Sequence, residues 1–204
     1  MIYRKRVQVL FGIPILLVLL LGSAVPALAD GIVIPHPPPD VPIAEVPFLT
    51  IKYHRVTVTI EDQVATTHVD QVFVNEGRHE VEGTYIFPLP EEATISEFSM
   101  WVDGERLEGQ VLERDEARRI YEDIVRSRRD PALLEYVGRD AFQASIYPIP
   151  PGGERRIELE YSQVLEADNG LVEYDYPLNT EKFSPQPLEE VVVNVTVRSN
   201  EPLK

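Results

Sequence analysis

The 204-residue sequence contains no cysteine, only one tryptophan and only four histidines. Without cysteine the chain can form no disulfide, no thiolate metal site and no cysteine nucleophile. Basic residues are also scarce, because 19 Lys and Arg stand against 34 Asp and Glu, for a formal net charge of −15. Phosphate binding needs clustered basic side chains, so this charge argues against a nucleic-acid partner and against docking on an anionic membrane surface.

The motifs of common catalytic and metal sites are missing as well. The sequence has no H-E-x-x-H, no D-x-[DN]-x-[DN]-G calcium loop and no G-x-S-x-G elbow. His54 and His68 lie in segments that alternate like strands, where we expect surface or edge positions. Among 34 acidic residues some pair always has glycosidase spacing, so such a pair carries no weight. We expect no enzyme activity, no cofactor and no tight metal site.

The first 29 residues have the pattern of a secretory signal peptide. Three basic residues at 4–6 precede the apolar run 7–21, and Ala27 and Ala29 occupy the small-residue positions of a cleavage site. We predict cleavage after Ala29 and a secreted or surface location, without membrane insertion of the mature chain. The apolar run is short for a bilayer span of about 20 residues. The alternative is an uncleaved N-terminal anchor.

Residues 30–47 include the proline-rich stretch "PHPPPDVPIAEVP". Proline-rich segments are extended and solvated, so we predict a linker that spaces the fold from the processing site. A docking motif for a proline-reading domain is the alternative. The folded domain is expected at 48–204.

From residue 48 onward, apolar and polar residues alternate in about nine segments, which is typical of strands. We expect turns at 75–77, 103–104, 151–153 and 169–170, where Asn, Asp, Pro and Gly gather. Pro88 and Pro90 should end a strand, because proline cannot donate a ladder hydrogen bond. Trp101 fits either the core or an interface, and we favour the core. Because no βαβ alternation occurs, we predict an all-β, antiparallel β-sandwich.

One segment breaks the alternation. Residues 113–128 are highly charged, lack glycine and carry apolar residues at helical spacing, namely Ala117, Ile120, Tyr121, Ile124 and Val125. Acidic residues stand near the start and Arg126 and Arg128 near the end, as the helix dipole favours. We predict one amphipathic α-helix whose apolar stripe packs on an apolar sheet face and which carries no catalytic residue.

Four pieces in this order resemble the vault protein inter-alpha-trypsin (VIT) domain family. They are "FPLP" at 87–90, "EARRIYE" at 116–122, "LLE" at 133–135 and "IPPGGERRIELEY" at 149–161. The resemblance covers about 48–165 and implies a β-sandwich with a packed helix. In inter-alpha-trypsin inhibitor heavy-chain-like proteins, such domains commonly precede a von Willebrand factor A domain. The D-x-S-x-S metal-site motif of that second domain is absent from this sequence.

The resemblance implies a non-enzymatic protein-interaction or structural module in the N-terminal part of a larger secreted or surface protein. Its expected partner is a protein, for which an adjacent von Willebrand factor A domain outside this chain is a candidate. The alternative function is an extracytoplasmic hydrolase fragment or an inhibitor-like protein. A catalytic constellation in a pocket would favour that alternative.

Overall fold

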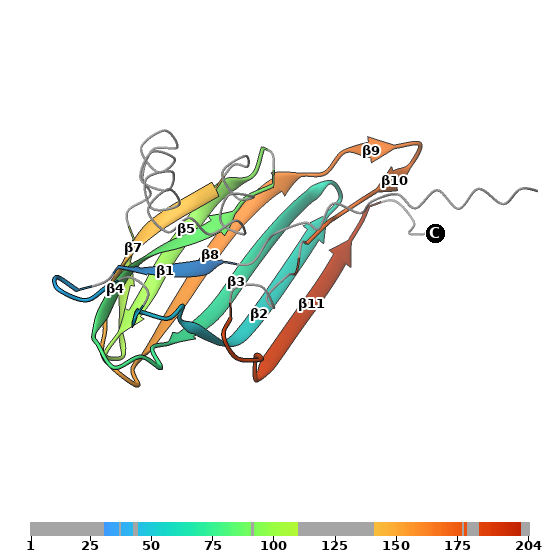
Figure 1. Ribbon diagram of the computed structural model, residues 1–204. Coiled ribbons are helices and arrows are strands. Elements are labelled where there is room, and N and C mark those ends of the chain that lie inside the picture. Colours follow the sequence, from blue (N-terminus) through green and yellow to red (C-terminus); the bar gives the residue numbers. More distant parts are fainter. Residues whose placement is uncertain are drawn as a thin grey trace, which may run out of the picture.

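The computed structural model describes residues 31–36, 38–42, 45–90, 92–109, 141–176, 178 and 184–200. These residues form strands almost throughout (Figure 1). The strands are β1 (Ile32–His36), β2 (Thr50–Glu61), β3 (Val64–Val74), β4 (Val81–Pro88), β5 (Thr94–Val102), β6 (Glu105–Glu108), β7 (Ala141–Ile149), β8 (Glu154–Val164), β9 (Ala167–Asp168), β10 (Leu171–Val172) and β11 (Glu190–Arg198). No α-helix lies within the described ranges. The helix expected at 113–128 falls outside them and stays a prediction.

Two sheets pack face to face. The large sheet has the order β11-β2-β3-β8-β5-β6, and the small sheet has the order β1-β4-β7. In Figure 1 the small sheet lies across the β5–β8 side of the large sheet, and β11 forms the opposite margin. Short strands β9 and β10 form a separate hairpin beyond β8. The all-β prediction is confirmed.

The expectation of purely antiparallel pairing is wrong for one pair. Strand β11 runs parallel to β2, with Glu190 beside Tyr53 and Arg198 beside Glu61. A two-residue turn can join only antiparallel neighbours, whereas a long connection allows the chain to return to the starting end of a strand. Here residues 173–189 separate β10 from β11, which is enough chain for such a return.

The core lies between the sheets and is built from alternate residues of the facing strands. At its centre, Tyr85 of the small sheet is fully buried against the rings of Phe73 and Phe98. The Tyr85 hydroxyl donates to Gln71 Oε1 at 2.8 Å, so the polar end of this ring is satisfied. Each large side chain buried in this way contributes about 1.5–3 kcal/mol. The core therefore holds β3, β5 and β8 firmly against β4 and β7.

A second, smaller apolar cluster lies under β2. It contains Val56, Val58, Ile60, Ala65 and Leu165, with Tyr174 and Tyr176 packed against it. The residues that follow β10 therefore cover the part of β2 that this cluster occupies. The apolar face of the large sheet thus has two coverings, the small sheet over its centre and residues 174–176 nearer β11.

The expectation of a solvated linker is wrong for β1. Ile32, Val33 and Ile34 are at most 3% exposed, and β1 pairs antiparallel with β4. The prolines that follow "IVI" indicate a linker, so the sequence alone does not predict this strand. Pro35 is tolerated because β1 is an edge strand, where half of the backbone N–H groups need no ladder partner.

The predicted turns are confirmed where the strands meet. Asp103 and Gly104 have φ of 52° and 86°, and Asn169 and Gly170 have φ of 52° and 79°. Both pairs suit the two-residue turn that joins antiparallel strands. Strand β4 ends at Pro88, as predicted.

Within the described ranges, no helix is long and apolar enough to span a lipid bilayer.

Candidate interaction surface on the large sheet

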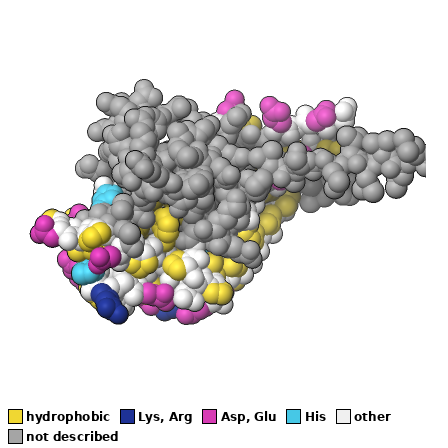
Figure 2. All heavy atoms as spheres, viewed as in Figure 1, with side chains coloured by type: hydrophobic (Ala, Val, Ile, Leu, Met, Phe, Trp, Pro, Cys, Tyr) yellow, Lys and Arg dark blue, Asp and Glu magenta, His cyan; other side chains and the backbone are white. Residues whose placement is uncertain are grey.

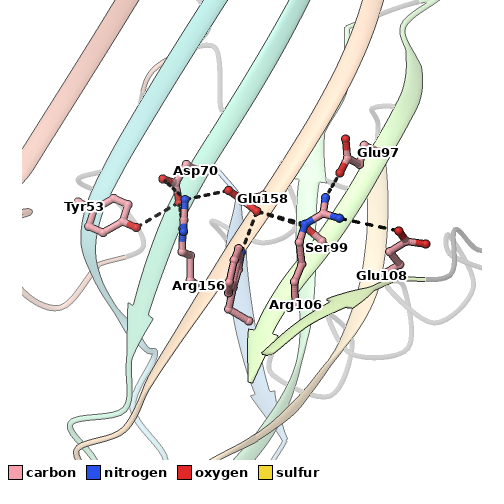
Figure 3. Close-up of polar contacts among 9 residues, drawn as sticks. Tyr53, Asp70, Glu97, Ser99, Arg106, Glu108, Arg156 and Glu158 are labelled. Carbon is pink, nitrogen blue, oxygen red and sulfur yellow. Dashed lines mark hydrogen bonds and ion pairs between the residues drawn. The ribbon is translucent and has the colours of Figure 1, made fainter. Parts of the chain in front are cut away.

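The outer face of the large sheet carries a connected set of polar side chains, which we call the outer-face network (Figure 3). Its members alternate with core residues, so they point away from the small sheet. They come from five neighbouring strands: Tyr53 of β2, Asp70 of β3, Arg156 and Glu158 of β8, Glu97, Ser99 and Trp101 of β5, and Arg106 and Glu108 of β6.

The strand register sorts these side chains into two adjacent rows. One row crosses the sheet through Asp70, Glu158, Ser99 and Glu108, and the next through Arg156, Trp101 and Arg106. Carboxylates directly opposite each other repel, so Asp70 beside Glu158 would destabilise the sheet without a counter-charge. The row of arginines supplies this counter-charge.

Arg156 connects the two acids. Its Nε and Nη2 donate to the Oδ1 and Oδ2 of Asp70 at 2.8 and 3.0 Å, and Nη2 also reaches Glu158 Oε1 at 2.8 Å. The Tyr53 hydroxyl adds a third donor to Asp70 at 3.1 Å. The hydrogen bond to Asp70 raises the pKa of Arg156. Burial, followed by the charge of Asp70, raises the pKa of Tyr53. Both groups therefore stay protonated and keep donating.

Trp101 is part of this surface, and the expectation that it lies in the core is wrong. Its indole Nε1 donates to Glu158 Oε2 at 2.8 Å, and the Arg156 guanidinium lies 5.2 Å from its ring centroid. Phe98 and Met100 of the same strand are in the core. The two-residue period places Trp101 on the face opposite Met100, where it is half-buried.

Arg106 completes the network at the β6 margin. It forms an ion pair with Glu97 and lies 3.7 Å from Glu158 and 3.8 Å from Glu108. Exposed pairs of this kind contribute roughly 0–1 kcal/mol each and are screened by salt. Their main effect is to hold the Arg106 and Trp101 side chains in fixed positions.

A separate ion pair links β2 to β11 on the same outer face. Arg55 Nε donates to Glu190, and the Arg55 guanidinium lies 4.2 Å from the Tyr53 ring centroid. The hydrogen bond with Arg55 lowers the pKa of Glu190 and raises that of Arg55. Both side chains are almost half exposed, so this pair fixes orientation more than it stabilises the fold.

The chemistry of the outer-face network suits recognition better than catalysis. Each carboxylate in it already contacts an arginine, and Glu158 also accepts from an indole. Arginine, tyrosine and tryptophan are the side chains that contribute most to binding energy at protein interfaces. Here they are held by neighbours before any partner arrives, which lowers the entropy lost on binding.

His54 and His68 lie in different environments, and only one of them agrees with the prediction. His68 is half-buried on the outer face, but His54 is fully buried on the inner face, where its Nε2 lies 2.9 Å from the Tyr176 hydroxyl. Burial lowers the pKa of His54 to about 4, with the charge of Asp70 opposing this shift. The expected surface or edge position is therefore wrong for His54. The described ranges contain no group of three or more histidines and carboxylates placed to hold a metal ion.

Two sets of predicted residues lie outside the described ranges. They are the helix stripe (Ala117, Ile120, Tyr121, Ile124 and Val125) and the cleavage-site residues Ala27 and Ala29. Conversely, sequence reasoning missed the outer-face network. The alternation in "RRIELEY" showed that Arg156 and Glu158 share a face, but only the strand register places Asp70 and Trp101 beside them.

A family model for the vault protein inter-alpha-trypsin domain matches residues 51–161, which is 111 of the 204 residues. The match begins in β2 and ends in β8, so it includes the whole outer-face network. It includes all of β3 and β5 and most of β2 and β8, four of the five long strands of the large sheet.

Three relatives illustrate the range of proteins that carry similar segments. The chain is 28% identical over 116 residues to protein mono-ADP-ribosyltransferase PARP4 of Mus musculus (57% of this chain, 6% of the relative). It is 29% identical over 125 residues to von Willebrand factor A domain-containing protein 5A of Homo sapiens (59% and 16%). It is 30% identical over 116 residues to inter-alpha-trypsin inhibitor heavy chain H4 of Homo sapiens (56% and 12%). The chain thus spans between 6% and 16% of the lengths of these relatives.

Similarity to solved structures is remote. A putative nutrient binding protein from Legionella pneumophila matches with a TM-score of 0.38 and 15% identity, covering 67% of this chain and 44% of that one. An M1 zinc metallopeptidase from Deinococcus radiodurans matches with a TM-score of 0.34 and 14% identity, covering 60% and 22%. Neither likeness carries an argument about function.

Proposed function

Because the chain belongs to the vault protein inter-alpha-trypsin domain family, we propose that it is a non-enzymatic module for binding another protein. It acts as the N-terminal part of a larger exported protein that carries a von Willebrand factor A domain downstream. The relatives support this architecture, since one is named for a von Willebrand factor A domain and all three are far longer than this chain.

The observation that carries the proposal is the outer-face network. The Arg156 guanidinium lies over the Trp101 ring, and Asp70 and Glu158 hold these two side chains across three strands. This arrangement presents a rigid aromatic and cationic centre with a rim of carboxylates. Such a centre is typical of the part of an interface that dominates affinity.

The adjacent von Willebrand factor A domain is the proposed partner. Its test uses the isolated A domain of human von Willebrand factor A domain-containing protein 5A as the probe, titrated into the chain by calorimetry. Trp101→Ala should weaken binding roughly tenfold or more, as expected for a dominant interface residue. Val164→Ala, at an exposed apolar residue (68% exposed) outside the network, should leave binding unchanged. Equal effects of the two substitutions would contradict the assignment of this surface.

Export is the second part of the proposal, and it rests on the N-terminal pattern of basic residues, apolar run and Ala27/Ala29. Cleavage after Ala29 leaves Asp30 as the first residue, two positions before β1. N-terminal sequencing of the protein isolated from its host should begin at Asp30. A protein that begins at Met1 and sediments with membranes would instead support the N-terminal anchor.

The stripe of the segment at 113–128 has a proposed role in the fold. Ile34 and Ile86 are fully buried, although they lie on the face of the small sheet opposite core residues Val33 and Tyr85. This face therefore also needs an apolar covering. The segment between β6 and β7 leads directly into the small sheet, and its stripe of Ile120, Ile124 and their neighbours supplies apolar surface for this purpose.

A further inference from the structure

Strand β11 is a long edge strand whose apolar side chains face solvent. Among the strands of the described ranges, its nine residues pair with β2 alone, on one side. Val191, Val193, Val195 and Val197 are 42%, 43%, 53% and 47% exposed. In the space-filling view, hydrophobic side chains form a band along the margin where Figure 1 draws β11 (Figure 2). We call these four residues the valine stripe.

The valine stripe continues the buried face of the sheet. In a parallel pair, residues in register point to the same side, and Val193, Val195 and Val197 are in register with Val56, Val58 and Ile60. Those three β2 residues are at most 8% exposed. The apolar layer therefore runs on past β2 and ends uncovered on β11.

The other three margins of the two packed sheets, as far as the described residues show them, are protected against pairing. Strand β6 has only four residues, and three of them are charged. The small sheet ends in β1 and β7, which contain Pro35 and Pro148. Short length, charge and proline are the devices by which proteins keep edge strands from pairing with other chains. Strand β11 has no proline, no lysine and an unbroken nine-residue register.

The backbone of β11 is oriented for pairing at this margin. The carbonyl of Arg198 accepts from the Asp62 N–H at 2.9 Å, so Arg198 directs its backbone groups toward β2. Backbone direction alternates along a strand, so the N–H and C=O groups of the valine stripe point to the open edge. Each of these valines can form a pair of ladder hydrogen bonds with an antiparallel strand.

We propose that β11 pairs antiparallel with β11 of a second copy of this chain, with Asn194 opposite Asn194 across a two-fold axis. This register places Glu190 opposite Arg198 of the second copy at both ends of the ladder, so opposite charges meet. It also places Val191 opposite Val197 and Val193 opposite Val195, so the two valine stripes form one continuous apolar face. A parallel arrangement would set Glu190 against Glu190, which is unfavourable.

The absence of cysteine makes a direct test of this register available. Opposite residues of a non-hydrogen-bonded antiparallel pair have Cα atoms about 4.5 Å apart, which is within the disulfide range. Asn194→Cys should therefore form a cross-linked dimer rapidly under mild oxidation. Thr196→Cys is the matched control, because it lies on the same face of the same strand, is also exposed and would face Val192 of the second copy. Equal cross-linking of the two variants would overturn the proposal.

The charges at the ladder ends provide a second test by sedimentation equilibrium of the unmodified protein and its variants. Glu190→Arg or Arg198→Glu alone should weaken dimerisation several-fold, and the double swap should restore it. Both side chains also form exposed ion pairs within the chain, with Arg55 and Glu61, which contribute little to folding. A double swap that is no better than the single changes would overturn the proposed register.

A third variant tests the apolar contribution. Val195→Lys places a charge in the valine stripe and should make the protein monomeric while circular dichroism shows an unchanged fold. Val164→Lys, at an exposed valine near the end of β8, should leave the dimer intact. A protein that is monomeric before any substitution, up to millimolar concentration, would overturn the proposal outright.

Discussion

Strands β8 and β11 carry the same alternation of apolar and polar residues, but their apolar residues end in different environments. Ile157, Leu159 and Tyr161 of β8 are each 1% exposed, whereas the valine stripe of β11 is 42% to 53% exposed. The small sheet packs over β8 and does not reach β11. Alternation thus determines which side chains share a face, and a second layer determines whether that face is buried.

The same comparison explains why the polar residues of the two strands differ in function. On β8, Arg156 and Glu158 lie in the middle of the sheet, with strands on both sides to supply partners. On β11, Glu190 and Arg198 form ion pairs with Arg55 and Glu61 of β2. A central position thus allows the side chains to hold one another in place, as the proposed recognition surface requires, and an edge position provides partners from one neighbouring strand.

The largest difference between the two strands is expected when one inner-face apolar residue of each strand is truncated. Leu159→Ala should lower the free energy of unfolding by about 3–5 kcal/mol, because the cavity lies in a closely packed core. Val193→Ala should change it by less than about 0.5 kcal/mol, since an exposed side chain has little burial to lose. Urea unfolding at low protein concentration measures both. Similar losses would mean that the valine stripe is covered in the monomer.

The segment at 113–128 offers a parallel test for the small sheet. Ile120→Ala or Ile124→Ala should cost roughly 2–5 kcal/mol if the stripe covers a sheet face. Arg119→Ala should cost no more than about 1 kcal/mol, because exposed ion pairs contribute little. Thermal unfolding distinguishes these outcomes. If Ile124→Ala leaves stability unchanged but abolishes binding of the A-domain probe, the stripe is an interface and the packing proposal is wrong.

Acid should weaken the β2 side of the molecule through His54. Its pKa in the folded chain is about 4, below the ordinary value of 6.5, because burial disfavours the charged ring. Between these values the unfolded chain binds a proton that the folded chain does not. Stability is therefore complete above pH 6.5 and falls toward pH 4, by roughly 3 kcal/mol from this group.

The check compares urea unfolding at several pH values in this range. His54→Gln should flatten the dependence relative to the unmodified chain. Carboxylates also titrate in this range, so the informative quantity is the difference between His54→Gln and the unmodified chain. An unchanged slope in His54→Gln would show that other groups cause the acid sensitivity.

A modest stability effect is expected in the outer-face network. Arg156→Ala leaves Asp70, whose side chain is only 11% exposed, with the Tyr53 hydroxyl as its remaining donor in the network. The cost should be roughly 1–2 kcal/mol, at the low end for a charged hydrogen bond because Arg156 is itself 37% exposed. Asp70→Asn combined with Arg156→Ala should cost less than the sum of the single changes. Strict additivity would argue against the observed bidentate contact.

Local sequence signals accounted for much of the fold. The turns at Asp103-Gly104 and Asn169-Gly170, the strand end at Pro88 and the all-β class follow from backbone rules that act over a few residues. The prolines from Pro35 onward indicate a linker rather than a strand, and only the pairing of β1 with β4 shows that Ile32 to Ile34 are buried. A local sequence pattern does not indicate which distant strands pair.

The candidate site was hidden for the same reason. The apolar neighbours of Trp101 predict a core position, but Phe98 and Met100 lie on the opposite face of β5. Asp70 and Arg156 are 86 residues apart and meet only through the β3–β8 register. Likewise, the parallel pairing of β11 with β2 determines that the valine stripe lies on the inner side of the sheet.

Hydrogen–deuterium exchange of the β11 and β3 amides tests the central contrast between a covered strand and an open one. At low protein concentration the amides of Val191, Val193, Val195 and Val197 should exchange rapidly, while those in the middle of β3 stay protected. At high concentration the β11 amides should gain protection as the second copy pairs, with β3 unchanged. Protection of β11 equal to that of β3 at every concentration would contradict the account, because it would show that this edge is already covered within one chain.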